Sequence, residues 1–170
     1  DLHAALLGQS FLHCPIFPTA TSASDSVQAA AQAADELVKN EDFVEKVKAA
    51  TPENPVVISV IAPDAIMTAH RDRTTGFANE MYELCQEWHP GAVEISGNDA
   101  FAKESETEPA VIVRTDIAAS RADEDVRNLA QSVVADEDVI AIFCVNEASA
   151  TGVLSATTDG TDLDRTSGKI

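Results

Sequence analysis

The chain has 170 residues, 45% of them apolar, and a formal net charge of −18 at pH 7. This length and apolar fraction predict one domain with its own hydrophobic core, and they exclude wholesale disorder. The negative charge repels phosphate backbones and anionic lipid, so we expect neither nucleic acid nor a membrane surface as a partner. No apolar run approaches the roughly 20 residues that span a bilayer.

The first part of the chain, residues 1–24, shows no clear periodicity, and we interpret it as an irregular N-terminal segment. Its mildly apolar stretch 4–14 ends in Cys14 but lacks the basic start of a secretory signal. The three cysteines, Cys14, Cys85 and Cys144, are odd in number and far apart. Their spacing predicts neither a disulfide framework nor a metal site.

From residue 25 to residue 170, segments with helical periodicity alternate with short apolar runs. Helices are expected over 25–39, 42–50, 69–88, 121–135 and 147–157, and strands over 55–62, 92–96, 110–117 and 139–145. Ser24 or Asp25 is expected to cap the first helix and Thr68 the third. The alternation predicts an α/β fold of three αβα layers, with a mostly parallel sheet between helices.

The clearest strand is the apolar run 139–145, which leads directly into a helix of small residues. A continuous apolar run of this length predicts a strand that is buried on both faces of a parallel sheet. Asn146 follows it, at the end of the strand where α/β sheets bind their ligands. Two interpretations stay open for Asn146, a ligand contact and the N-cap of the next helix, and one does not exclude the other.

Two arginines, Arg71 and Arg73, stand near the start of the helix 69–88. Because they are two residues apart they point in different directions, so one can face the carboxyl edge of the sheet while the other faces solvent. An arginine close to the strand exit at Asp64 could hold hydroxyl or carboxylate groups of a ligand. His70 has no Asp or Cys spacing that supports catalysis or metal binding, and no glycine-rich phosphate loop is present. We therefore expect no cofactor and no metal.

Three segments together resemble the sugar-binding type I periplasmic binding proteins, the ribose/galactose-type substrate-binding components of ABC importers. They are Arg71-Asp72-Arg73-Thr74-Thr75-Gly76-Phe77, Asp136-Glu137-Asp138-Val139-Ile140-Ala141-Ile142-Phe143 and Asn146-Glu147-Ala148-Ser149-Ala150-Thr151-Gly152-Val153-Leu154. The resemblance implies a lobe of a two-lobed binding protein that performs no catalysis. It also implies that Arg71 and Asn146 contact the sugar, that an ABC permease is the protein partner, and that the protein is extracytoplasmic, in the periplasm or at the cell surface.

Some features of that family have no counterpart here. No acid lies near Phe17-Pro18-Thr19, Ile117-Ala118-Ala119 replaces an expected stacking aromatic, and a strand with Gly-Phe-Asp would fall beyond Ile170. The resemblance thus covers mostly one lobe, over 25–170, and we expect it to be partial. An uncovered sheet edge would also favour self-association of the chain.

Two alternative functions are retained. The effector-binding domain of a LacI-type transcription regulator has the same lobe, but the chain has no helix-turn-helix pattern and no basic segment. A Rossmann- or flavodoxin-like enzyme is less favoured because the sequence lacks a phosphate loop and a catalytic constellation.

Overall fold

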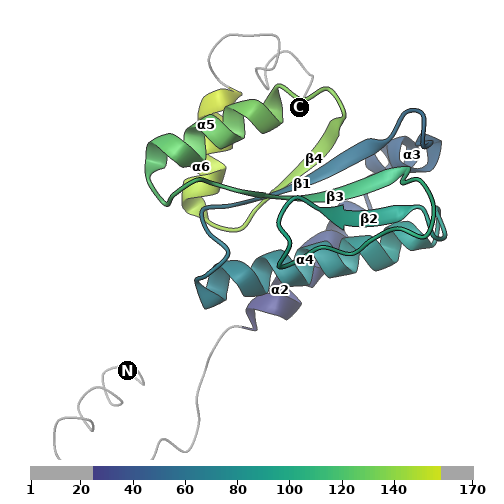
Figure 1. Ribbon diagram of the computed structural model, residues 1–170, viewed down its shortest axis with the longest axis horizontal. Helices are drawn as coiled ribbons and strands as arrows, with labels where there is room; N and C mark the ends of the chain where they lie inside the picture. The colour runs from purple at the N-terminus through teal and green to yellow at the C-terminus, as the bar shows by residue number, and fades with distance from the viewer. Residues whose placement is uncertain (1–24, 158–170) are drawn as a thin grey trace, which may run out of the picture.

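The computed structural model describes residues 25–157 and shows a parallel sheet between two layers of helices (Figure 1). The helices are α2 (Ser26–Leu37), α3 (Glu41–Ala49), α4 (Thr68–Gln86), α5 (Asp123–Val134) and α6 (Glu147–Ala156). The strands are β1 (Val56–Ala62), β2 (Val93–Ser96), β3 (Val111–Ile117) and β4 (Val139–Cys144). The three-layer αβα fold predicted from the sequence is confirmed. The predicted N-terminal segment 1–24 lies outside the described residues.

The sheet has the order β2-β3-β1-β4, and every pairing in it is parallel. β1 pairs with β3 on one side and with β4 on the other. The alternation of strands with crossover helices predicts that the runs 56–62, 111–116 and 139–145 are parallel neighbours, and this is confirmed. In Figure 1, α2 and α4 cover one face of the sheet, and α5 and α6 cover the other. This arrangement places the connections after β1 and after β4 on opposite faces of the sheet.

The centre of the sheet is β1, in which all seven residues are buried. Its alternate side chains face two different helical layers. Ile58 and Val60 belong to the large apolar cluster beneath α2 and α4, whereas Ile61 packs with Ala130 and Val133 of α5. A strand buried on both faces is stable only where both faces are covered.

Side chains cap three of the five described helices, α2, α3 and α6, whereas α4 and α5 start without a side-chain cap. Asp25 accepts a hydrogen bond from the Gln28 backbone N–H, as expected for the first helix. Thr68, however, does not cap α4. The cap position is Met67, and its side chain makes no capping bond, so that prediction was wrong. Thr68 is instead the first residue of the helix, after a turn in which Asp64 accepts the backbone N–H groups of Ile66 and Met67.

β4 is an edge strand, which corrects the prediction that the run 139–145 is buried on both faces. All six of its residues are only half-buried, because no described strand pairs with its second side. Phe143 is stacked on Phe77 of α4, with ring centroids 4.2 Å apart. This contact fixes the end of β4 against α4. Burial raises the pKa of the Cys144 thiol to about 11, so at neutral pH Cys144 is a packing group.

The opposite edge of the sheet, at β2, is partly closed. Ile95 of β2 forms an antiparallel bridge with Lys103, which lies in the polar stretch between β2 and β3. Phe101 of this stretch packs against the main apolar cluster. None of the helices in the described part of the chain is long and apolar enough to cross a membrane.

The layer formed by α2 and α4 depends on a close approach at Gly76. A Cβ added at this position would lie 2.2 Å from the backbone oxygen of Val27 in α2. Real Cβ atoms do not come so close to a backbone oxygen, so any side chain at Gly76 must push the two helices apart. The glycine in the motif that predicted a ligand site therefore has a packing role.

We predict that Gly76→Ala lowers the free energy of unfolding by about 2 kcal/mol or more, since overpacking against backbone cannot be relieved by a rotamer change. Gly152→Ala is the matched control, because a Cβ there meets the side chain of Ala130 at 3.3 Å and gains up to about 1 kcal/mol of helix propensity. Urea unfolding of the three proteins measures both values. Equal stability of Gly76→Ala and the native chain would contradict the packing role.

Candidate functional site

The connections at the carboxyl ends of the strands diverge around β1. The connection after β1 leads to α4 on one face of the sheet, whereas those after β3 and β4 lead to α5 and α6 on the other (Figure 1). Such a divergence opens a crevice beyond the carboxyl ends of the strands, where open α/β sheets bind ligands. The polar residues that follow β1 and β4 lie at this edge.

Asn146 follows β4 and caps α6. Its Oδ1 accepts a hydrogen bond of 3.0 Å from the Ser149 N–H and one of 2.9 Å from the Ser149 hydroxyl. Its Nδ2 lies 3.3 Å from Nε2 of His70, which belongs to the first turn of α4. The N-cap interpretation of Asn146 is confirmed. The amide also joins the starts of two helices that lie on opposite faces of the sheet.

His70 is buried, and its second ring nitrogen faces a carboxylate. Nδ1 lies 3.0 Å from Oδ2 of Asp64, in the turn after β1. Oδ1 of Asp64 accepts the backbone N–H groups of Met67 and Ile66 at 2.7 and 2.8 Å. These backbone bonds, that of Met67 first, together with His70, hold the pKa of Asp64 below its ordinary value although burial opposes them. Asp64 is therefore ionised at neutral pH.

The turn after β1 also contacts the connection between β3 and α5. Nε of Arg121 lies 3.8 Å from Oδ2 of Asp64, and Nη1 of Arg121 lies 3.3 Å from the Met67 sulfur. Both contacts are at the surface. Ile66, next to Met67, is 88% exposed. This edge of the sheet thus carries a cation, Arg121, and two exposed large apolar side chains, Ile66 and Met67.

The two arginines of α4 have different surroundings. Arg73 is half-buried and donates a 2.8 Å hydrogen bond from Nη1 to the carbonyl of Val145, directly before Asn146. Arg71 is exposed, one residue after His70, and its side chain makes no hydrogen bond or ion pair with another residue between 25 and 157. The structure therefore brings Asn146 together with His70, Asp64 and Arg73. Ligand contact by Arg71 stays a prediction.

The His70–Asp64 pair was missed by the sequence analysis. The two residues are six apart, and the turn between a strand and a helix brings them together. An acid at a strand exit followed by a histidine in the first helical turn is the signal that could have found them. The third member, Asn146, is 76 residues away from His70, and only the parallel pairing of β1 with β4 places it there.

The arrangement suits recognition by hydrogen bonds. Nε2 of His70 already contacts Asn146 and the Ser149 hydroxyl is fully buried, so the cluster does not present a histidine-activated nucleophile. Amide, imidazole and guanidinium groups offer donors and acceptors to a polar ligand. In the part of the chain that the structure describes, no group of three or more His, Cys, Asp or Glu side chains could hold a metal ion.

A second polar cluster ties the sheet together beneath the α5 layer. Nε of Arg114 in β3 donates to both carboxylate oxygens of Asp116 at 3.0 Å, and Nη1 donates to Asp136 at 2.7 Å. The hydroxyl of Ser59 in β1 donates to Asp116 at 2.6 Å. The hydrogen bond from Arg114 holds the pKa of Asp136 below its ordinary value. All its members are paired, so we interpret this cluster as structural.

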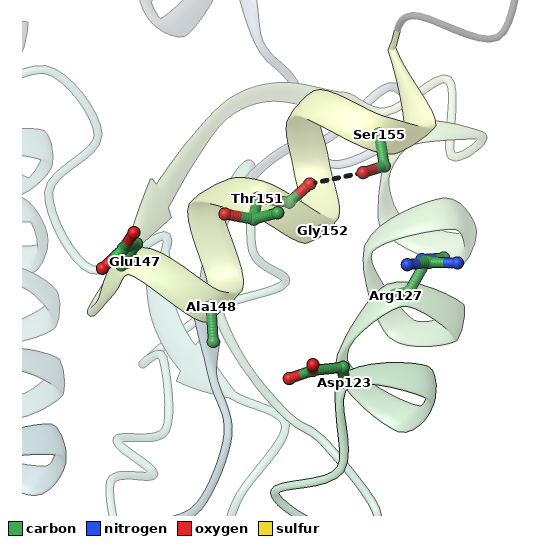
Figure 2. A pocket seen from close by; sticks show the side chains of 7 residues that line it. All are labelled: Asp123, Arg127, Glu147, Ala148, Thr151, Gly152 and Ser155. Carbon is green, nitrogen blue, oxygen red and sulfur yellow. Dashed lines mark hydrogen bonds between the residues drawn. The ribbon is translucent and has the colours of Figure 1, made fainter.

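A hollow of about 280 Å³ lies between α5 and α6 (Figure 2). It is lined by Asp123, Arg127, Glu147, Ala148, Thr151, Gly152 and Ser155. The hydroxyl of Ser155 donates to the backbone carbonyl of Thr151, as the dashed line in Figure 2 marks. The hollow is on the outer surface of the helical layer, and none of the residues that line it belongs to the cluster around His70.

We predict that Arg114→Met lowers the free energy of unfolding at pH 7 by about 2 kcal/mol, because it leaves two partly buried carboxylates without their cation. A depressed carboxyl pKa contributes stability that is present above its unfolded value, roughly 4, and is lost as the pH falls through the folded pKa. The loss should therefore be smaller at pH 3 than at pH 7. Chemical unfolding at both pH values measures it, with the exposed Arg127→Met as control. An equal loss at the two pH values would contradict the ionic role.

Comparisons with known proteins agree with the architecture. No protein-family model matches the chain, and no curated protein matches it. A solved structure from Brachyspira murdochii, described as "ABC transporter, LacI family transcriptional regulator", superposes with a TM-score of 0.59 at 22% sequence identity. The match covers 81% of this chain and 37% of that protein. This likeness shows the fold alone, which is type I periplasmic-binding-protein-like.

Proposed function

We propose that this chain binds a sugar as the solute-binding component of an ABC importer and carries out no catalysis. The observation that carries the proposal is the position of Asn146. Its amide lies at the carboxyl end of β4, joined to His70 and, through the adjacent carbonyl of Val145, to Arg73. A planar amide beside imidazole and guanidinium groups can donate to and accept from the hydroxyls of a sugar.

In this proposal Arg71 and Asn146 are the residues that contact the sugar. Arg71 is exposed at the start of α4, one residue from His70, so its guanidinium is free to reach a ligand from the rim. The matched structure is longer, since the superposition covers only 37% of it. A second lobe, facing this edge of the sheet, would enclose the ligand. The permease is then the protein partner, and the protein acts outside the cytoplasm.

A second candidate is the effector-binding domain of a LacI-type regulator. The description of the matched structure names both an ABC transporter and a LacI family regulator, so it supports both functions equally. Both functions place a small molecule at the same edge of the sheet, so the site alone does not separate them. The net charge of −18 disfavours contact of this chain with DNA. Co-purification with a permease favours transport, whereas sugar-dependent retention on operator DNA favours regulation.

The test is a titration of the 170-residue chain with D-ribose and D-galactose, followed by the backbone and side-chain amide signals in NMR spectra. A site formed by one lobe encloses little of the ligand, so we expect binding in the millimolar range or weaker. Signals of residues around Arg71, His70 and Asn146 should shift, and signals of α3, at the opposite end of the strands, should not. Shifts confined to another surface, or none with any sugar tested, would contradict the proposal.

Substitutions test which residues contact the sugar in this titration. Arg71→Ala should weaken binding by roughly 2 kcal/mol, because a charged hydrogen bond is lost, so the shifts at a fixed subsaturating sugar concentration fall about 30-fold. Asn146→Ala should cost about 1 kcal/mol of binding and destabilise α6 by a similar amount through its cap. Arg127→Ala on α5 removes the same charge outside the site and should leave the shifts unchanged. Equal effects of Arg71→Ala and Arg127→Ala would contradict a contact by Arg71.

A further inference from the structure

In the hydrogen bond between His70 and Asn146, the donor can be assigned from the other partners of the two side chains. Asp64 is ionised and can only accept, so the proton of neutral His70 resides on Nδ1, which donates to Oδ2 at 3.0 Å. Nε2 then has a free lone pair. The Asn146 group that faces Nε2 at 3.3 Å is Nδ2, an amide donor. The hydrogen bond therefore runs from Asn146 to His70.

Asn146 cannot turn its amide round without loss. Its Oδ1 accepts both the backbone N–H and the hydroxyl of Ser149, and these bonds form the cap of α6. A flipped amide would point its N–H₂ group at the Ser149 N–H, which costs the cap, worth about 1 kcal/mol. The donor therefore faces His70 when the ring is neutral, and protection of the Ser149 N–H reports whether the amide keeps this orientation when the ring is protonated.

We propose that His70 is a pH-sensitive latch between α4 and α6, closed when the ring is neutral and open when it is protonated. A second proton on Nε2 points an N–H directly at the Asn146 N–H₂ group. Two donors then face each other where there was one hydrogen bond, and the contact must separate. Histidine is the usual pH-switch side chain of proteins, because its imidazole gains a charge on acidification.

The charges around His70 decide which of its two ring contacts, to Asp64 or to Asn146, breaks on protonation. Asp64 faces Nδ1 from the turn after β1, and Arg121 lies beside Asp64 from the connection before α5. On α4 itself Arg71 and Asp72 are the neighbouring residues, and Glu147 follows Asn146 at the start of α6. A protonated ring is attracted to Asp64, so the ring stays with the turn after β1. The contact that opens is the one to Asn146.

His89 provides an internal control in the same chain. Its Nε2 lies 2.7 Å from the backbone carbonyl of Val47, an acceptor, so this nitrogen carries a proton in the neutral ring. Protonation of His89 adds its proton at Nδ1 and leaves the Nε2–H bond in place. On protonation His70 thus loses its contact with the start of α6, whereas His89 keeps its contact with α3.

Opening of the latch frees both N–H groups of Asn146 to face a ligand at the carboxyl edge of the sheet. This consequence rests on the proposed function. The latch itself is a property of the chain without ligand. It is therefore tested in the absence of sugar, so that a failure of the latch and a failure of sugar binding are separate results.

The test follows the ring nitrogens of His70 and the side-chain N–H₂ of Asn146 by NMR between pH 8 and pH 5. At pH 8 we expect the Nδ1–H tautomer of His70. On acidification the Asn146 N–H₂ signals should shift with the same midpoint as the His70 ring, and their protection from exchange, relative to the intrinsic rate at each pH, should fall about five-fold as one hydrogen bond is lost. The Ser149 N–H, held by the cap, should remain protected.

Three variants separate the latch from a general acid effect. His70→Gln should abolish the pH-dependent shift of Asn146, whereas His89→Gln should leave it. Asn146→Asp keeps an oxygen for the cap but offers an acceptor to Nε2, so the opening should disappear and the midpoint of His70 should move to higher pH. An Nε2–H tautomer at pH 8, or Asn146 signals that do not follow His70 in the native chain, would overturn the proposal even if a variant does not fold.

Discussion

The structure depends on the complete burial of β1. Its seven residues pair with β3 and five of them also with β4, and the strand faces a helical layer on both faces, so neither edge nor face of it can be left to water. The burial requires α2 and α4 on one face and α5 on the other, and each helix must be reached from a strand of the same sheet. The alternation of helices and strands along the chain meets that requirement.

The same requirement creates the candidate site. Since the chain leaves β1 toward one face and leaves β3 and β4 toward the other, the carboxyl ends of neighbouring strands have diverging connections. Backbone groups and helix starts at such a point cannot pair with one another as strands do, so side chains satisfy them. Asp64 accepts two backbone N–H groups at the start of α4, and Asn146 accepts one at the start of α6. These two residues are also the ones that hold His70 between them.

Polar side chains bridge the layers where apolar packing is thin. The apolar cluster beneath α5 is small, with Ile61, Ala130 and Val133 as its buried members. There the hydrogen-bonded set of Arg114, Asp116 and Asp136 adds connections between β3 and the segment that precedes β4. On the other face, where the apolar cluster is large, α2 and α4 approach closely at Gly76, where a Cβ would lie 2.2 Å from the backbone oxygen of Val27. The two faces of one sheet are therefore stabilised by different means.

Local patterns determined much of the fold. The apolar run of β1, the periodicity of α4 and the cap at Asn146 depend on residues within a few positions, and each was predicted from the sequence. The cap of α4 was predicted wrongly because the helix begins one residue earlier than expected, at Thr68, after a turn that Asp64 closes by accepting the Ile66 and Met67 N–H groups. The predicted neighbours β3, β1 and β4 were also found, because parallel connections leave few arrangements open.

Contacts between distant residues were decided only by the tertiary structure. The apolar composition of β4 resembles that of a central strand, yet β4 is an edge strand, since strand order is set by the whole sheet. The sequence allowed either Arg71 or Arg73 to face the sheet, and the carbonyl of Val145, 72 residues away, selected Arg73. The sequence by itself thus determined the elements, their alternation and the place of Asn146 at a strand end. The partners of His70 follow from register and crossover, because hydrogen bonds across 76 residues exist only after the strands have paired.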